Sequence, residues 1–147
     1  MDIIGLVQSA VEKNASDLHI TVGIPPMLRI NGQLIKYNDE ILYSDDTEKL
    51  VRQLLSEKQF EELNEKGQID TSYSRSGIGR FRVNAYKQRG SYAMAIRVIP
   101  LLVPTIDELG LPSIIKDISR TNRGLILVTG PTGSGKSTTL ASMVNLI

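Results

Sequence analysis

The sequence predicts a mixed fold, with an α+β domain at residues 1–100 and then the first strand–loop–helix unit of an α/β domain at 114–147. Short alternating segments and helix signals share the first hundred residues. A continuous apolar run, Leu125–Val128, then leads into a glycine-rich loop and a helical segment from Lys136 to Ile147. Such a run is typical of a strand buried on both faces. Prolines frame the stretch 101–113, which we interpret as the linker between the domains.

The composition excludes several classes of function. The chain has 147 residues, a net charge of +1, no cysteine and a single histidine, so disulfides and cysteine- or histidine-rich metal sites are excluded. The near-zero charge gives no indication of a nucleic-acid partner. No apolar run approaches the roughly 20 residues that span a bilayer, and the N-terminus lacks the basic start of a signal peptide. We therefore expect a cytoplasmic protein with no direct membrane insertion.

The first forty residues read as a helix and three short strands. Apolar residues recur at helical spacing over 2–13, and Asp2 is placed to cap that helix. Residues 17–22 alternate polar and apolar, as a half-buried strand does. Two further strands, 27–30 and 33–35, are joined by an Asn-Gly pair typical of a tight hairpin.

Two more helices and a strand follow. One helix is predicted to open at Asp45 with Glu48 three residues later, and the next at Ser56 with Gln59, because both pairs fit the capping box. Gly67 stands where a helix ends in a left-handed glycine. Alternation at 69–74 predicts a strand, and 113–120 a short helix.

Residues 80–99 predict a long hairpin around Arg89-Gly90. A two-residue loop there places Phe81 opposite Val98 and makes one face of the hairpin uniformly apolar. The other face carries four polar side chains: Arg80, Arg82, Asn84 and, opposite Arg82, Arg97.

The facing arginines Arg82 and Arg97 have two interpretations. Like charges directly opposite each other on a sheet are mildly destabilising, and an anion bound between them relieves the repulsion. The alternative is a solvated polar face on which both guanidiniums reach water or pair with carboxylates. A register slip of one residue moves Arg97 to the other face.

Asp17 and His19 share one face of the first predicted strand. An isolated histidine is more often a structural residue with satisfied hydrogen bonds. The alternative for His19 is a contact with a nucleotide base or with another subunit.

The segment from Gly130 to Ser137 fits the phosphate-binding pattern G-x-x-x-x-G-K-[ST], between a predicted strand and a predicted helix. Glycines allow the backbone to wrap a phosphate closely, and the helix N-terminus adds positive potential. We expect Lys136 to reach the β- and γ-phosphates, the Ser137 hydroxyl to bind Mg²⁺, and Thr138 to contact the α-phosphate. The predicted nucleotide-binding residues are Gly130, Pro131, Thr132, Gly133, Ser134, Gly135, Lys136, Ser137 and Thr138. The pattern does not distinguish ATP from GTP, and the alternative is a glycine-rich turn without a ligand.

Several segments together resemble PilT-type type IV pilus retraction ATPases of the secretion ATPase superfamily. The matching segments, in the family's order, are ASDLHITVGIPPMLRING (15–32), GRFRVN (79–84), AIRVIP (95–100), LGLP (109–112) and GLILVTGPTGSGKSTT (124–139). The resemblance covers essentially the whole chain. The short lead-in before residue 15 and the run at 21–26 favour the retraction branch; a pilus assembly or type II secretion ATPase is the alternative.

The resemblance implies a PAS-like first domain, a RecA-like second domain, and a homo-hexameric ring with ATP and Mg²⁺ between the two domains. It implies a motor for pilus retraction and twitching motility. Such a motor lies at the inner face of the cell membrane and works with an inner-membrane pilus platform protein. Arg82 and Arg97 match family arginines that contact the nucleotide phosphates, so the resemblance favours a catalytic role for both.

One departure from the family is large. The sequence ends one helix after the phosphate loop, and the family's acidic box, catalytic glutamate segment and histidine box are absent. We therefore expect a truncated form that hydrolyses ATP negligibly and acts only as a nucleotide-binding or oligomerisation module. Because the run 125–128 lacks sheet neighbours, we expect residues 121–147 to be disordered, to lie against the first domain, or to pair between chains.

Overall fold

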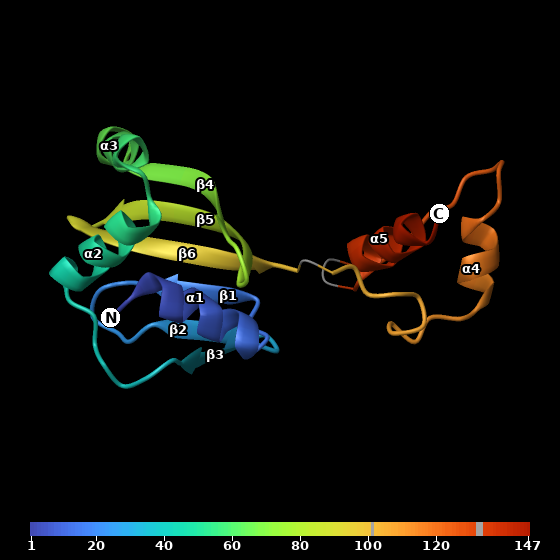
Figure 1. Cartoon of the computed structure of the whole chain (residues 1–147), viewed down its shortest axis with the longest axis horizontal. Coiled ribbons are helices and arrows are strands. Elements are labelled where there is room, and N and C mark those ends of the chain that lie inside the picture. Colours follow the sequence, from blue (N-terminus) through green and yellow to red (C-terminus); the bar gives the residue numbers. More distant parts are fainter. Residues whose placement is uncertain (101, 132–133) are drawn as a thin grey trace. The chain divides into compact units, whose positions relative to one another are not determined.

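A computed structural model describes residues 1–100, 102–131 and 134–147. The chain divides into two compact units, Met1–Pro100 and Leu101–Ile147 (Figure 1). The first unit combines helices with an antiparallel sheet, and the described part of the second contains two helices.

The first unit is built on a six-stranded sheet in the order β3-β2-β1-β6-β5-β4, in which every neighbouring pair is antiparallel. The strands are β1 (Asp17–Ile20), β2 (Met27–Ile30), β3 (Gln33–Lys36), β4 (Gln68–Arg75), β5 (Gly79–Gln88) and β6 (Ser91–Ile99). The pairing of β1 with β6 brings the N-terminal strands beside the long C-terminal hairpin. Residues 80 positions apart in the sequence, Asp17 and Arg97, thus become direct cross-strand neighbours.

Both predicted hairpin turns are confirmed. The central residues of each turn have positive φ, 50° and 82° at Asn31-Gly32 and 50° and 81° at Arg89-Gly90. These angles belong to the tight turn whose twist matches that of antiparallel strands. Gln88 pairs with Ser91, which fixes the predicted register along β5 and β6.

Three helices supply the other half of the first unit: α1 (Ile3–Glu12), α2 (Ser44–Leu54) and α3 (Glu57–Lys66). The predicted caps of α1 and α3 are present. Asp2 accepts a hydrogen bond from the Gly5 amide at 3.3 Å, and the Ser56 amide donates to Gln59 Oε1 at 2.9 Å. Gly67 ends α3 in the left-handed region with φ 77°.

The predicted cap of α2 is wrong by two residues, because the N-cap is Tyr43 and not Asp45. The helix begins at Ser44, and the Tyr43 amide donates to the Asp46 carboxylate at 3.0 Å. Glu48 lies a turn further on and pairs instead with Arg52 at 2.9 Å. Asp46, two positions before Glu48, accepts the hydrogen bond from the free Tyr43 amide, so the capping frame lies two residues earlier than the predicted pair.

The core lies between one face of the sheet and the three helices. Its strand residues alternate along the chain, as expected when one face is buried. They include Leu18, Ile20, Leu28, Phe81, Val83, Ala85, Met94 and Ile96, and the helices contribute Ile3, Leu6, Val7, Leu50, Val51, Phe60 and Leu63. The side chains at the intervening strand positions face the opposite way, and these are predominantly polar.

The second unit contains α4 (Ile114–Ser119) and α5 (Lys136–Leu146). The Ser142 hydroxyl of α5 donates to the Pro104 carbonyl at 2.6 Å, and the neighbouring Met143 is buried. These contacts attach α5 to the segment that follows residue 102.

The predicted strand at Leu125–Val128 is not formed, which corrects the sequence-based expectation. Leu125 is 82% exposed and Leu127 is 74% exposed. A strand needs a neighbouring chain for its backbone hydrogen bonds, and no described residue of the second unit lies in a strand. The apolar run therefore has strand composition without a strand partner.

Phe81 tests the central packing of the first unit, because its side chain is fully buried in β5. We expect Phe81→Ala to lower the free energy of unfolding by about 3–5 kcal/mol through lost burial and the remaining cavity. Leu34→Ala is the control, because Leu34 is 51% exposed on edge strand β3, and it should change stability by less than about 0.5 kcal/mol. Urea denaturation measures both, and equal effects would contradict the assigned core.

Candidate functional site

Charged side chains cross the polar face of the sheet in one line. Successive cross-strand partners are Arg29 on β2, Asp17 on β1, Arg97 on β6, Arg82 on β5 and Ser72 on β4. We call these five residues the charged row. The row confirms the predicted register, in which Arg82 and Arg97 face each other, and it places both arginines on the face away from the helices.

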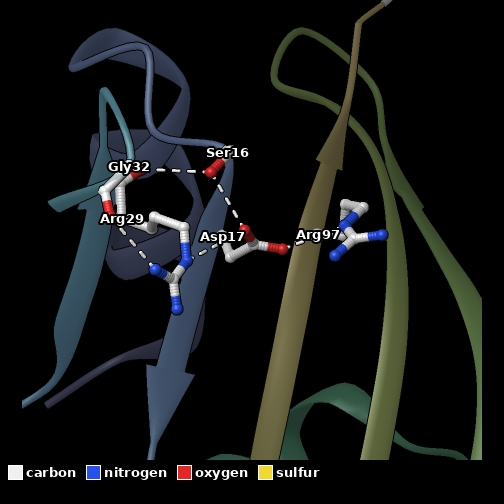
Figure 2. A network of polar contacts seen from close by, with 5 residues as sticks. All are labelled: Ser16, Asp17, Arg29, Gly32 and Arg97. Atoms are coloured by element: carbon white, nitrogen blue, oxygen red, sulfur yellow. Dashed lines mark hydrogen bonds and ion pairs between the residues drawn. The ribbon is translucent and has the colours of Figure 1, made fainter. Parts of the chain in front are cut away.

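Asp17 is the centre of the row (Figure 2). Its Oδ1 accepts a hydrogen bond from Arg97 Nε at 2.9 Å, and its Oδ2 accepts one from Ser16 Oγ at 2.9 Å. Arg29 Nε lies 3.5 Å from the same Oδ2. Both oxygens of one carboxylate are thus engaged by groups from two neighbouring strands and from the residue before β1.

The environment of Asp17 stabilises its charged form. Partial burial pushes the pKa of its carboxyl upward, but the hydrogen bonds from Arg97 and Ser16 and the nearby positive charges outweigh that effect. The net result is a pKa below the ordinary value, so Asp17 is ionised throughout the neutral range.

Arg82 has a looser partner. Its Nε lies 3.7 Å from Asp70 Oδ1, and both side chains are more than half exposed. A hollow of about 200 Å³ opens on this face, lined by Asp17, Asp70, Arg82, Asn84, Ala95 and Arg97. Each of the facing arginines therefore has a carboxylate beside it, and each also borders an open polar hollow. Their contact with phosphate stays a prediction.

His19 lies on the same face of β1 as Asp17. Burial lowers the pKa of its imidazole; the charge of Asp17 opposes this, and the charges of Arg29 and Arg97 reinforce it. Its Nε2 atom is buried and has no hydrogen-bond partner among the described residues. The expectation of a structural histidine with satisfied hydrogen bonds is therefore wrong at this atom, and the imidazole is neutral at pH 7.

The phosphate loop leads directly into α5. Gly135 precedes the helix in the left-handed region with φ 89°, and a side chain at Gly130 would bring a Cβ to 2.7 Å from Ser134 Oγ. Lys136 Nζ donates to the Pro131 carbonyl at 2.6 Å, so the ammonium folds back over the loop. The predicted binding residues Thr132 and Gly133 lie outside the described residues.

These features fit a triphosphate with its magnesium ion. A side chain at Gly130 would meet Ser134, the Lys136 ammonium already lies over the loop, and the first amides of a helix have no carbonyl partner within it. The Ser137 side chain in the first turn of α5 is exposed and offers a hydroxyl to a cation. Among the described residues no group of three histidine or acidic side chains could hold a metal by itself, so the fit depends on the phosphates as partners of the ion.

Sequence reasoning missed Arg29 and did not connect Asp17 with Arg97. The alternation at 17–22 placed Asp17 on the polar face, but its partners depend on the long-range pairing of β1 with β6. The only sequence signal for Arg29 was its position in the hairpin that also contains Gly32, whose carbonyl accepts a hydrogen bond from Arg29 Nη1 at 3.2 Å.

Comparison with known proteins gives consistent matches. A family model described as "Type II/IV secretion system protein" matches residues 2–147. The type IV pilus retractation ATPase PilT of Pseudomonas aeruginosa is 41% identical over 147 residues, which is all of this chain and 43% of that protein. The type IV pilus ATPase PilU of the same organism is 40% identical over 144 residues, or 98% of this chain and 38% of PilU.

A solved structure, described as the pilus retraction motor PilT with bound ADP, matches with a TM-score of 0.81 and 44% identity. The match covers 99% of this chain and 43% of that one. The chain thus spans less than half the length of the relatives that it matches. Within the described ranges, no helix has the length and apolar character needed to cross a bilayer.

The lowered pKa of His19 predicts that the free energy of unfolding depends on pH. Its folded pKa lies below the ordinary 6.5, so below that pH the unfolded chain takes up a proton that the folded chain does not. The free energy of unfolding should therefore fall as the pH drops from 6.5 towards the folded pKa. His19→Gln should flatten this part of the curve. Asp17 acts at lower pH, because its contribution is lost only as the pH falls through a pKa below 3.8.

Denaturant melts at intervals between pH 7.5 and 5 measure this slope. The control is the wild-type chain across the same buffers, since His19 is the only histidine in the sequence. An unchanged slope in His19→Gln would contradict the assigned environment of the imidazole.

Proposed function

The chain belongs to the Type II/IV secretion system protein family, and on that premise we propose that it is the ATP-binding part of a motor ATPase that drives type IV pilus retraction and twitching motility. The observation that carries the proposal is the match to PilT along all 147 residues, which includes the phosphate loop. PilU, a second pilus ATPase, matches almost as much of the chain, so two relatives support the same system.

The nucleotide site of the proposal is the loop before α5. The related motor was solved with ADP, and the loop here has a glycine cradle, a folded-back ammonium and a helix N-terminus at one place. In the proposed complex Lys136 exchanges the Pro131 carbonyl for the β- and γ-phosphates, Thr138 contacts the α-phosphate, and Ser137 holds Mg²⁺. Bound ATP supplies the phosphoanhydride bond whose hydrolysis drives the motor.

Arg82 and Arg97 are proposed as phosphate-contacting arginines. Both are about two-thirds exposed, at 68% and 69% of their side chains, so neither needs to leave a buried position to meet an anion. Arginine suits this role because its planar group donates two parallel hydrogen bonds to phosphate oxygens. Arginines brought from another domain or subunit stabilise developing charge in phosphoryl transfer.

The proposal extends to architecture and setting. Residues 1–100 form a PAS-like domain, 101–113 the linker, and 114–147 the start of a RecA-like ATPase domain. The working motor is a homo-hexamer in the cytoplasm, at the inner face of the membrane, where it engages a pilus platform protein. These statements follow from the resemblance to pilus retraction ATPases, and the likeness to PilT supports that resemblance.

The test of nucleotide binding is Lys136→Ala. Removal of the ammonium should weaken Mg-ATP binding at least about tenfold, because a charge-assisted contact to phosphate is lost. Lys58→Ala is the matched control, since it removes the same group from the exposed surface of α3. Titration calorimetry measures both, and equal affinities for wild type and Lys136→Ala would overturn the proposed function.

A polypeptide of residues 1–147 should bind Mg-ATP yet turn it over negligibly. The helix that follows the loop, Lys136–Leu146, contains no acidic residue. This helix therefore provides no carboxylate to orient the attacking water molecule. A phosphate-release assay at saturating Mg-ATP measures this. Steady turnover at the roughly 1 s⁻¹ or more of ordinary enzymes, abolished by Lys136→Ala, would contradict the prediction.

A further inference from the structure

We propose that Asp17 is a positioning residue, which holds the guanidinium of Arg97 in the orientation that contacts phosphate. The proposal rests on the proposed function, because it assigns a partner to one of the two phosphate-contacting arginines. The nucleotide site is tested at Lys136 and the positioning role at Asp17, so either proposal can fail while the other stands.

The contact between Asp17 and Arg97 leaves the outer edge of the guanidinium open. Arg97 donates through Nε at 2.9 Å, and neither terminal nitrogen has a hydrogen-bond partner among the described residues. The carboxylate side chain is 13% exposed, whereas the arginine side chain is 69% exposed. One end of the guanidinium is thus anchored in the sheet while its two terminal nitrogens stay available. Those nitrogens form the pair of donors that binds an oxyanion in bidentate fashion.

Asp17 can act as an anchor because it is itself fixed. Ser16 Oγ donates to its Oδ2, and Arg29 Nε lies on the same side (Figure 2). Arg29 is held in turn by the Gly32 carbonyl at the β2–β3 turn. A continuous set of contacts therefore runs from that turn to Arg97. An arginine held in this way loses less conformational freedom when it binds a ligand.

Arg82 provides an internal comparison. It faces Arg97 across the β5–β6 pair, but its carboxylate partner Asp70 is 3.7 Å away and 57% exposed. Asp70 therefore lacks both the short hydrogen bond and the burial that make Asp17 a rigid support. The structure assigns the two carboxylates different roles although each lies beside one of the two facing arginines.

The direction in which nucleotide affinity changes when Asp17 loses its charge distinguishes a positioning role from simple electrostatic repulsion. A carboxylate beside a phosphate site repels the anion, so removal of its charge alone should tighten nucleotide binding. If the carboxylate instead competes with phosphate for the arginine, removal of its charge should also tighten nucleotide binding. Only a carboxylate that orients the arginine makes binding weaker when its charge is removed.

The experiment is a double-mutant cycle on the full chain, with Mg-ATP as the probe and titration calorimetry as the readout. The variants are Asp17→Asn, Arg97→Gln and the double variant. Asp17→Asn should weaken binding about three- to tenfold, the cost of ordering one long side chain. In the Arg97→Gln background the same change should have an effect below about 1.5-fold, because the residue that Asp17 positions is gone.

Asp70→Asn is the matched control, since it removes the same charge beside the facing arginine Arg82. Its Mg-ATP affinity should stay equal or become slightly tighter.

Thermal unfolding identifies variants that fail to fold. If Asp17→Asn fails to fold, Arg29→Gln takes its place in the cycle, because it removes a contact of Asp17 and keeps the charge of Asp17. The expected loss of Mg-ATP affinity is the same. Equal or tighter binding in Asp17→Asn, or an equal loss with and without Arg97, would overturn the proposal. If Lys136→Ala still weakens Mg-ATP binding at least about tenfold, the proposed function stands although the role of Asp17 does not.

Discussion

One carboxylate holds two arginines of different strands on the polar face of the sheet. Asp17 accepts a hydrogen bond from Arg97 and lies beside Arg29, and these residues come from β1, β6 and β2. Without it, the line of cross-strand neighbours would contain three arginines and no opposite charge, an arrangement that antiparallel sheets disfavour. The contact also marks the junction at which the first strands of the chain join the long β5–β6 hairpin. The polar face and the order of strands in the sheet therefore depend on the same pairing.

The sheet arginines and the loop before α5 are held in place by different physical means. On the sheet, arginine side chains are held by carboxylates, and the quality of each support differs between Arg97 and Arg82. In the loop before α5, main-chain geometry matters more, because glycines accept positive φ and a Cβ at Gly130 would meet Ser134. Side-chain anchoring can be adjusted by single substitutions in the sheet, whereas a side chain at Gly130 would force Ser134 to move.

Local signals predicted most of the first unit. The Asn31-Gly32 and Arg89-Gly90 turns, the Ser56 cap and the alternation along β5 and β6 depend on neighbouring residues, and the structure confirms all of them. The pairing of β1 with β6 was not predictable in this way, because nothing in residues 17–20 specifies a partner 80 positions later. The roles of Asp17 and Arg29 were hidden for the same reason. The strand expected at 125–128 failed for a related cause, since apolar composition shows that a segment can enter a sheet but does not provide the neighbour.

The proposal that Arg82 and Arg97 contact nucleotide phosphate can be tested directly by nuclear magnetic resonance. The Nε–Hε signals of Arg82 and Arg97 and the backbone amides of Gly135 and Lys136 are followed together while Mg-ATP is added. The account predicts that the arginine signals shift and saturate with the same dissociation constant as the loop amides. Loop amides that shift to saturation while both arginine signals stay unchanged would contradict it.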